Sequence, residues 1–281
     1  MQKPKDKIAP NTAKANDPRP RGKANNARPR GKAAALPKAR RPRQKISLYT
    51  PEEIEEIFRR FSIQRPSPKG ELDYSDAFTL LVAVVLSAQA TDIGVNKATG
   101  PLFAVANTPE QIVALGEAQV GEYIRTIGLW RNKAKNVVAL SEALIRDHGG
   151  QVPSTREELV MLPGVGRKTA NVVLDIFFGQ PTIAVDTHIL RISSRIGLAP
   201  GKTPDQVEAA LMRVIPDHYM RHAHHWLILH GRYVCKARKP DCENCVIADL
   251  CKWPEKTSNV AAPLVEIEPA TPAGLYSQKV E

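Results

Sequence analysis

Four cysteines, the only ones in this 281-residue chain, lie inside the seventeen residues CKARKPDCENCVIADLC. They are Cys235, Cys242, Cys245 and Cys251, with the spacing C-x6-C-x2-C-x5-C. Four thiolates in one short loop suit either tetrahedral zinc or an iron–sulfur cluster, because both take soft sulfur ligands. The loop has a single C-x2-C pair, whereas zinc sites usually have two, and this difference favours iron–sulfur.

Disulfide bonds are the alternative chemistry for clustered cysteines. No stretch of the sequence reaches the length of a membrane span, and the N-terminus lacks the apolar core of a secretory signal. These features predict an intracellular, reducing compartment, where clustered thiols bind metal more often than they pair. We therefore expect a metal-binding loop over residues 235–251.

A second segment whose residues could take part in binding or catalysis is LPGVGRKTANVVL, residues 162–174. Its Pro-Gly-Val-Gly turn predicts a tight connection between two helices, because glycine adopts backbone conformations closed to other residues. Gly164 and Gly166 have no side chain that would keep a phosphate from the free N–H groups of the next helix. Such a contact positions nucleic acid without reading its bases. A plain helical hairpin is the alternative.

Lys168 follows the second glycine by two residues, in the first turn of the expected helix. A lysine amine is a nucleophile only when unprotonated, and the positive end of a helix dipole and partial burial both disfavour the ammonium form. Asp186, in the segment AVDTHI, is placed to cap a helix over residues 187–195. A phosphate-contacting or solvated lysine and a purely structural cap are the alternatives.

The elements that must position these groups are predicted to be helices. Four segments place Ser or Thr three residues before Glu or Gln, as at a helix N-terminus: Thr50–Glu53, Thr108–Gln111, Ser154–Glu157 and Thr203–Gln206. The apolar run over residues 78–90 predicts a helix buried in the middle of a bundle. Alternating patterns bounded by hairpin turns are sparse, so the predicted class is all-α.

The net charge of +11 is concentrated at the N-terminus. Residues 1–45 contain fifteen Lys or Arg and two Asp, whereas the other 236 residues have a net charge of −2. With few large apolar side chains, residues 1–45 are expected to be a disordered basic tail that binds nucleic acid by counterion release. A solubilising tail and a targeting peptide are the alternatives. Residues 255–281 are expected to form a loose C-terminal tail.

These motifs, in this order, resemble the endonuclease III family of DNA glycosylases in the helix–hairpin–helix superfamily. The segments TIAVDTHILR (182–191), LLVAVVLSAQATDIGVNKAT (80–99) and TIGLWRNKAKNV (126–137) extend the resemblance over about residues 46–254. It implies a two-lobed, all-α fold with a DNA cleft. The central helical lobe would span about residues 70–180, and the cluster lobe residues 46–69 and 181–254, with a [4Fe–4S] cluster in the loop 235–251.

The resemblance also implies catalytic roles for Lys168 and Asp186. The amine of Lys168 would attack C1′ of a nucleotide turned out of the duplex, and the Schiff base formed would permit β-elimination 3′ to the lesion. Asp186 would stabilise positive charge on the sugar. Implied DNA contacts are Gln89, which would fill the gap in the duplex, the Ile127–Leu129 wedge, Leu162, Gly164, Gly166, Thr187 and the basic loop residues Lys236, Arg238 and Lys239. Ile127 and Leu129 could instead belong to the core, and Asp241 would weaken the phosphate affinity of the basic loop.

The implied function is that of a bifunctional DNA glycosylase and AP lyase of base excision repair, a monomer in the bacterial cytoplasm, associated with the nucleoid and not with a membrane. Its partner would be double-stranded DNA with oxidised pyrimidines or abasic sites. A monofunctional adenine glycosylase would lack Lys168, and a non-catalytic DNA-binding module would need neither Lys168 nor Asp186. Four histidines are expected to be satisfied by hydrogen bonds or exposed, and not to be metal ligands: His222, His224, His225 and His230.

Overall fold

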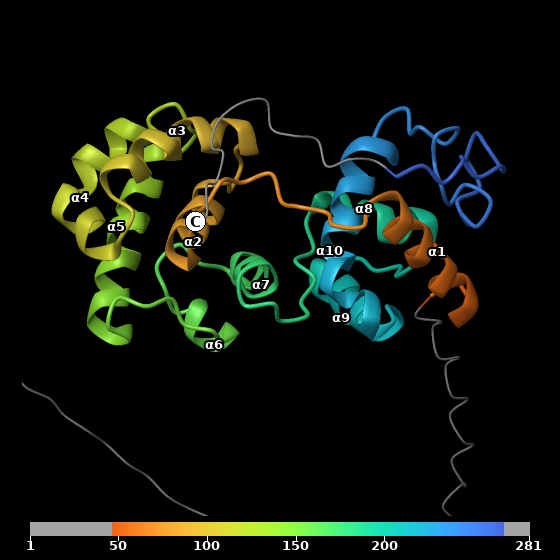
Figure 1. Ribbon diagram of the computed structural model, residues 1–281, viewed down its shortest axis with the longest axis horizontal. Helices are drawn as coiled ribbons and strands as arrows, with labels where there is room; N and C mark the ends of the chain where they lie inside the picture. Colours follow the sequence, from red (N-terminus) through yellow and green to blue (C-terminus); the bar gives the residue numbers. More distant parts are fainter. Residues whose placement is uncertain (1–46, 267–281) are drawn as a thin grey trace, which may run out of the picture. The chain divides into compact units, whose positions relative to one another are not determined.

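The computed structural model describes residues 47–266, and within this range all regular structure is helical (Figure 1). The predicted all-α class is therefore confirmed. The helices are α1 (Pro51–Gln64), α2 (Ala77–Leu86), α3 (Asp92–Val105), α4 (Pro109–Ile124), α5 (Trp130–His148), α6 (Arg156–Leu159), α7 (Arg167–Ile176), α8 (Thr187–Ile196), α9 (Pro204–Val214) and α10 (Met220–Leu229), with a 3-10 helix at Asp217–Tyr219 and a π-helix at His230–Val234. None of these helices is long and apolar enough to cross a membrane. The basic tail, residues 1–45, lies outside the described residues.

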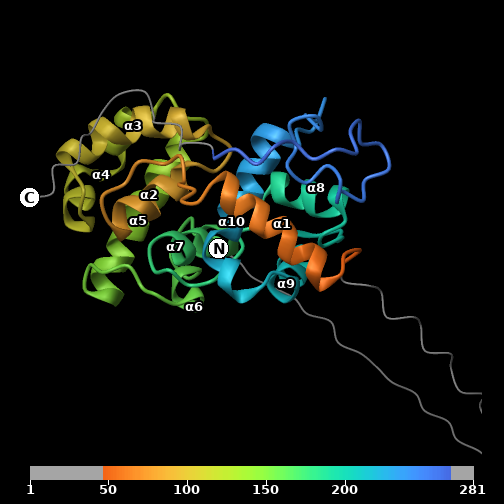
Figure 2. The ribbon, with the colours of Figure 1, turned by 45° about the vertical axis from the view of Figure 1, so that its right-hand side comes forward.

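The helices pack around two separate hydrophobic cores. One core draws its buried side chains from α2 to α7, and the other from α1, α8 to α10 and the cysteine loop. Figures 1 and 2 show the same division, with α1 beside α8 to α10 although it comes first in the chain. Tyr49, just before α1, donates a hydrogen bond from its hydroxyl to the carbonyl of Ile196 at 2.7 Å. The N-terminal segment therefore completes the second core.

Helix α2 is the centre of the first core, because all nine residues from Phe78 to Leu86 are buried. Asp76 caps its N-terminus by accepting a hydrogen bond from the Thr79 N–H at 2.8 Å. The apolar run was expected to remain helical to residue 90, and this expectation was wrong. Ser87 to Ala90 form a turn closed by a 3.0 Å hydrogen bond between the Ala90 N–H and the Ser87 carbonyl.

Three of the four predicted N-caps are confirmed. Thr50, Thr108 and Thr203 accept hydrogen bonds from the N–H groups of the residues three positions later, and each is followed by proline. The fourth prediction was off by one residue. Thr155, not Ser154, caps α6, because its hydroxyl accepts the Glu158 N–H.

The segment after residue 254 was expected to be loose, but its first part contacts the second core. The Ala262 N–H donates to the carbonyl of Cys245 at 3.1 Å, and Ala262 packs against that core. Lys256 donates from Nζ to the Ala248 carbonyl at 2.8 Å. These contacts hold residues 256–262 against the cysteine loop.

Candidate active site and cysteine-lined cavity

The hairpin between α6 and α7 uses its two glycines differently. Gly164 has φ +77°, and a Cβ there would lie 3.0 Å from Cβ of Asn136, so both the conformation and the space favour glycine. Gly166, the N-cap of α7, has φ −94°, an ordinary value, and our conformational argument was wrong for it. A Cβ on Gly166 would meet no atom within 4 Å, and no side chain caps α7. The missing side chain therefore keeps the N-terminus of α7 open.

Lys168 is the second residue of α7, and its side chain is exposed. The partial burial expected for it was wrong, although Ala170 in the same turn is fully buried in the first core. Its positive charge nevertheless reaches the buried His224. Burial lowers the pKa of His224 to about 3, and the charges of His225, Lys168 and Arg232 contribute to the shift. The buried His224 is therefore neutral at physiological pH.

Asp186 is the N-cap of α8, as the sequence predicted. Its Oδ1 accepts a hydrogen bond from the Ile189 N–H at 2.8 Å, and the residue is half-buried. This bond fixes the carboxylate at the positive end of the helix dipole. Asp186 can therefore be both a cap and a fixed negative charge in the site.

Arg232, which sequence reasoning missed, joins this group from the π-helix. Its Nη1 donates to Oδ2 of Asp92 at 2.6 Å and also to a carboxylate oxygen of Glu71. Burial alone would lower the pKa of Arg232, but the bond to Asp92 and the negative charges of Asp92, Glu71 and Asp186 outweigh burial and raise it. No sequence motif marks this residue, because its partners are more than 130 positions away.

Three of the predicted DNA contacts other than glycine have left-handed backbone conformations, and one of them is Lys239 of the basic loop (φ 51°). The other two, Gln89 (φ 56°) and Leu129 (φ 60°), are both exposed at turns, one after α2 and one before α5. Non-glycine residues rarely adopt positive φ, and such strain concentrates at functional sites. Thr187 is exposed in the first turn of α8. The exposed side chains of Gln89, Leu129 and Thr187 can therefore reach a ligand without unfolding of the protein.

Two other predicted contacts have side chains buried in the first core. Ile127 is 4% exposed and belongs to the first core, so it cannot act as a wedge while the core is intact. Leu162 is also 4% exposed, and its N–H is bonded to the carbonyl of Leu159. The sequence could not separate Ile127 from Leu129, because both are apolar residues of one short loop.

The basic loop residues Lys236, Arg238 and Lys239 are all exposed. Arg195 of α8 holds the backbone of this loop by donating hydrogen bonds to the carbonyls of Lys236 at 2.7 Å and Ala237 at 3.1 Å. The carboxylate of Asp241 accepts two hydrogen bonds from Nδ2 of Asn244, at 3.0 and 3.1 Å. Because the amide of Asn244 is neutral, the negative charge of Asp241 stays in the loop, and its expected effect on phosphate affinity remains a prediction.

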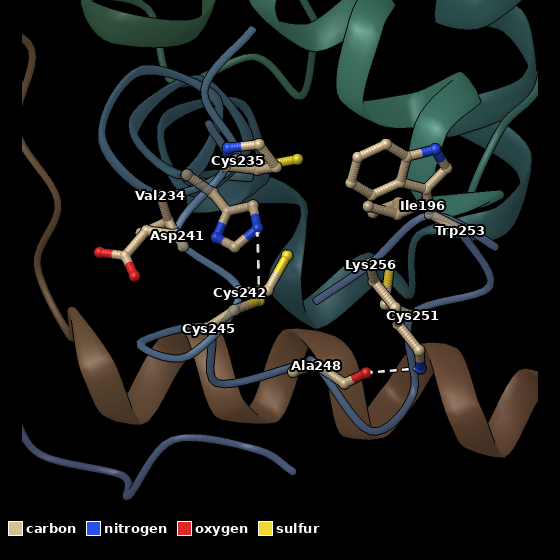
Figure 3. A pocket seen from close by; sticks show the side chains of 12 residues that line it. Ile196, Val234, Cys235, Asp241, Cys242, Cys245, Ala248, Cys251, Trp253 and Lys256 are labelled. Atoms are coloured by element: carbon tan, nitrogen blue, oxygen red, sulfur yellow. Dashed lines mark hydrogen bonds between the residues drawn. The ribbon is translucent and has the colours of Figure 1, made fainter. Parts of the chain in front are cut away.

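The four cysteines line one cavity, together with His230, Trp253 and Lys256 (Figure 3). All four are free thiols, and Cys235 and Cys245 are buried. Nε2 of His230 lies 3.9 Å from Sγ of Cys245. The disulfide alternative therefore does not apply to the described structure.

The four thiols of the loop are soft ligands of the kind that hold zinc or an iron–sulfur cluster. Among residues 47–266, no group of three or more Cys, His, Asp or Glu side chains is close enough to hold one metal ion. Tetrahedral zinc requires four sulfurs at about 2.3 Å from one centre, whereas a cubane cluster holds its four thiolates further apart, around a larger body. Burial, and then the charges of the other three cysteines, raise the pKa of Cys245 to about 12. Iron bound to these sulfurs would stabilise the thiolates and so offset the free-energy cost of ionising a buried thiol.

The histidines of α10 and the π-helix are buried more deeply than the sequence suggested. Burial lowers the pKa of His225 and of His230 to about 4, so both are neutral at physiological pH. Nδ1 of His224 and Nδ1 of His225 form no hydrogen bond within the described part of the chain. The expectation that such histidines are satisfied or exposed was wrong for these two residues.

Two family models match this chain. The model of the HhH-GPD superfamily base excision DNA repair proteins matches residues 82–217, and that of the iron-sulfur binding domain of endonuclease III matches residues 235–251. Endonuclease III of Rickettsia conorii is 56% identical over 200 residues, which are 71% of this chain and 95% of that protein. Endonuclease III of Escherichia coli K12 is 54% identical over 201 residues, 72% of this chain and 95% of that protein.

Solved structures of endonuclease III are also similar to this chain. A trapped covalent intermediate of endonuclease III with DNA has a TM-score of 0.69 and 44% sequence identity, covering 73% of this chain and 97% of that chain. A non-covalent endonuclease III–DNA complex has the same TM-score and identity. A thermostable thymine-DNA glycosylase, at 23% identity and a TM-score of 0.64, shares the fold.

Proposed function

This chain belongs to the endonuclease III family, and from that membership we infer that it is a bifunctional DNA glycosylase and AP lyase of base excision repair. The iron–sulfur domain match assigns it a [4Fe–4S] cluster. We propose that its substrate is double-stranded DNA containing oxidised pyrimidines or abasic sites, and that it acts as a monomer. The two cores correspond to a central lobe and a cluster lobe in this proposal.

Lys168 is the proposed nucleophile. The single observation that carries this assignment is its place in the first turn of the uncapped helix α7, two residues after the unobstructed Gly166. Backbone N–H groups at such a helix start bind phosphate, so the DNA strand would be held beside the amine. A related endonuclease III has been trapped in a covalent intermediate with DNA, which supports a covalent mechanism here.

Asp186 is proposed to handle the charge that develops during the reaction. As the glycosidic bond breaks, positive charge grows on the sugar, and a fixed carboxylate stabilises that charge without reorganising. The same carboxylate can accept a proton when the amine of Lys168 attacks C1′. The bond from the Ile189 N–H to Oδ1 keeps it in place for both steps.

The exposed residues around this pair are proposed to hold the opened duplex. Gln89 would fill the space left by the extruded nucleotide, and Leu129 would part the stacked bases beside it. Lys236, Arg238 and Lys239 would contact phosphates from the basic loop. The cysteines Cys235, Cys242, Cys245 and Cys251 would hold the cluster, whose contribution when bound is to cross-link this loop to the end of the π-helix.

The decisive experiment is borohydride reduction of the holoenzyme with duplex DNA that contains an oxidised thymine. A covalent complex with the wild-type protein and none with Lys168→Ala is expected, because truncation removes the atom that joins C1′. The Lys168→Ala variant should still bind lesion DNA within about tenfold of wild type, equivalent to about 1.4 kcal/mol. Weakened binding with an unchanged single-turnover rate would assign Lys168 to phosphate contact and overturn the proposal.

Asp186→Asn separates catalysis from capping. Asparagine remains a good N-cap, so α8 should be retained, while the negative charge is lost. The single-turnover excision rate should fall much more than the affinity for lesion DNA. Equal losses of rate and affinity would contradict a role in the chemical step.

A further inference from the structure

The π-helix His230–Val234 continues α10 and packs directly on α8. A Cβ added to Gly231 would lie 3.0 Å from Cβ of His188 and 3.4 Å from its carbonyl oxygen, so the two backbones are in close contact. Arg191 of α8 also donates to the Gly231 carbonyl at 2.6 Å. His188 is two residues after Asp186. The π-helix therefore rests against the helical turn that carries the proposed catalytic carboxylate.

On its other side the π-helix reaches the first core through Arg232. Asp92, which accepts its 2.6 Å hydrogen bond, is the first residue of α3 and follows the strained Gln89 by three positions. The side chains of Arg232 and Asp92 are 27% and 17% exposed, so water only partly screens this ion pair. The contact connects the second core to the turn that presents Gln89.

Glu71 fixes the same arginine to the segment between α1 and α2. Its carboxylate accepts hydrogen bonds from Arg232 and from the hydroxyl of Tyr233. Asn96 of α3 holds this segment by donating to the Glu71 carbonyl at 2.8 Å and accepting the Asp73 N–H at 3.0 Å. The guanidinium thus joins two carboxylates that are themselves attached to α3.

We propose that Arg232 is a positioning residue, which sets the placement of the Gln89 turn relative to Asp186 by holding α3 against the π-helix. Nη1 of Arg232 donates to both carboxylates, and its two N–H bonds are fixed in the plane of the guanidinium, whereas a lysine ammonium is a point charge on a flexible stem. π-helical turns are rare and are frequent at functional sites, which agrees with such a role. The inference rests on the proposed function of Gln89 and Asp186.

The requirement for this spacing follows from the chemistry. An extruded nucleotide can be held only if the residue that fills the duplex and the groups that act on C1′ are at a fixed separation. Misplacement of reacting groups by about 1 Å can cost on the order of 100-fold in rate. Loss of the Arg232 contact would therefore slow base excision while leaving most phosphate contacts intact.

The test compares Arg232→Lys and Asp92→Asn with wild-type holoenzyme. Single-turnover base excision should fall about 10- to 100-fold in each variant, whereas the Kd for duplex DNA with a reduced abasic site should change by less than about threefold and the melting temperature by only a few degrees. Asp92→Asn keeps the size of the side chain, so it tests the contact even if Arg232→Lys folds poorly. Arg146→Lys, in an exposed ion pair with Asp147, is the matched control and should match wild type.

A double-mutant comparison distinguishes positioning from general destabilisation. If Arg232 acts through the Gln89 turn, Arg232→Lys should cost much less in a Gln89→Ala background than in wild type, because interacting sites are not additive. Fully additive losses, or single variants as fast as wild type, would overturn the inference. Failure of the wild-type protein itself to excise the base or to be trapped would instead overturn the proposed function.

Discussion

The guanidinium of Arg167 donates two hydrogen bonds to the carboxylate of Glu208, at 2.9 and 3.0 Å. Glu208 is almost fully buried, with 7% of its surface exposed. Arg167 is the first residue of α7, directly before Lys168, and Glu208 belongs to α9. This paired contact therefore ties the turn that carries the proposed nucleophile to the second core.

Glu208→Gln should destabilise the protein by about 1–3 kcal/mol, because hydrogen bonds to charged groups are worth that much and the arginine keeps its charge. Urea-induced unfolding would measure the change. Glu122→Gln is the control, since Glu122 pairs with Arg125 where both side chains are more than 60% exposed, and it should change stability by less than about 0.5 kcal/mol. Equal effects of both substitutions would mean that the Arg167 contact does not hold α7.

The two hairpin glycines should respond differently to alanine. Gly164→Ala should destabilise the fold by about 1–2 kcal/mol or more, because the residue has φ +77° and its Cβ would press on Asn136. Gly166→Ala should fold normally but bind DNA more weakly, because the new methyl group occupies the approach to the N-terminus of α7. Thermal unfolding and equilibrium DNA binding would separate the two effects, and a Gly166→Ala protein with wild-type affinity would argue against a phosphate site there.

Alanine substitutions of Leu129 and Ile127 form a second pair of variants to compare. Leu129→Ala should change stability by less than about 0.5 kcal/mol, because the side chain is 60% exposed, yet it should lower single-turnover excision. Ile127→Ala should cost about 2–5 kcal/mol, as for other buried aliphatic side chains. Undiminished excision by Leu129→Ala would exclude it as the wedge.

The cysteine-lined cavity should contain iron and not zinc. Purified protein is expected to be brown and to carry about four iron atoms and as many acid-labile sulfides per chain. Cys245→Ala should lose the colour and much of the soluble protein, because Cys245 is buried in the second core and cluster binding would be coupled to folding. Metal analysis that finds one zinc and no iron would contradict the cluster assignment.

Asp175 should make part of the stability depend on pH. Burial raises its pKa from 3.8 to about 7, although the nearby charge of Arg221 opposes the shift. The folded state therefore binds a proton that the unfolded state has released between about pH 4 and pH 7, and stability from this group falls as pH rises through that range. Asp175→Asn should remove the penalty and gain on the order of 3 kcal/mol at pH 8, with a smaller gain at pH 5.

Urea-induced unfolding of wild type and variant at both pH values measures this difference. Buried histidines with lowered pKa values make stability rise with pH in both proteins. The effect of Asp175 is therefore read from the difference in stability between wild type and variant at each pH. Asp217→Asn, at an exposed position, should change stability little at either pH. A gain for Asp175→Asn that is the same at pH 5 and pH 8 would show that Asp175 does not titrate in this range.

The sequence by itself determined the features that depend on near neighbours. N-caps at Thr50, Thr108 and Thr203, the buried helix α2 and the cap role of Asp186 follow from contacts within three or four positions, which spacing encodes directly. The cysteine loop is equally local, because all four thiols lie within seventeen residues. The order of these motifs was sufficient to place the chain in its family.

Only the tertiary structure decided which side chains point outward and which distant groups meet. Ile127 and Leu129 have similar hydrophobicity and are two positions apart, yet one is buried in the first core and the other is exposed at the start of α5. The exposure of Lys168 and the bonds from Arg232 to Asp92 and Glu71 likewise follow from the packing of α7, α3 and the π-helix. The contacts of Arg232 join residues more than 100 positions apart. No periodicity along the chain records them, because they arise only where the elements of the two cores pack together.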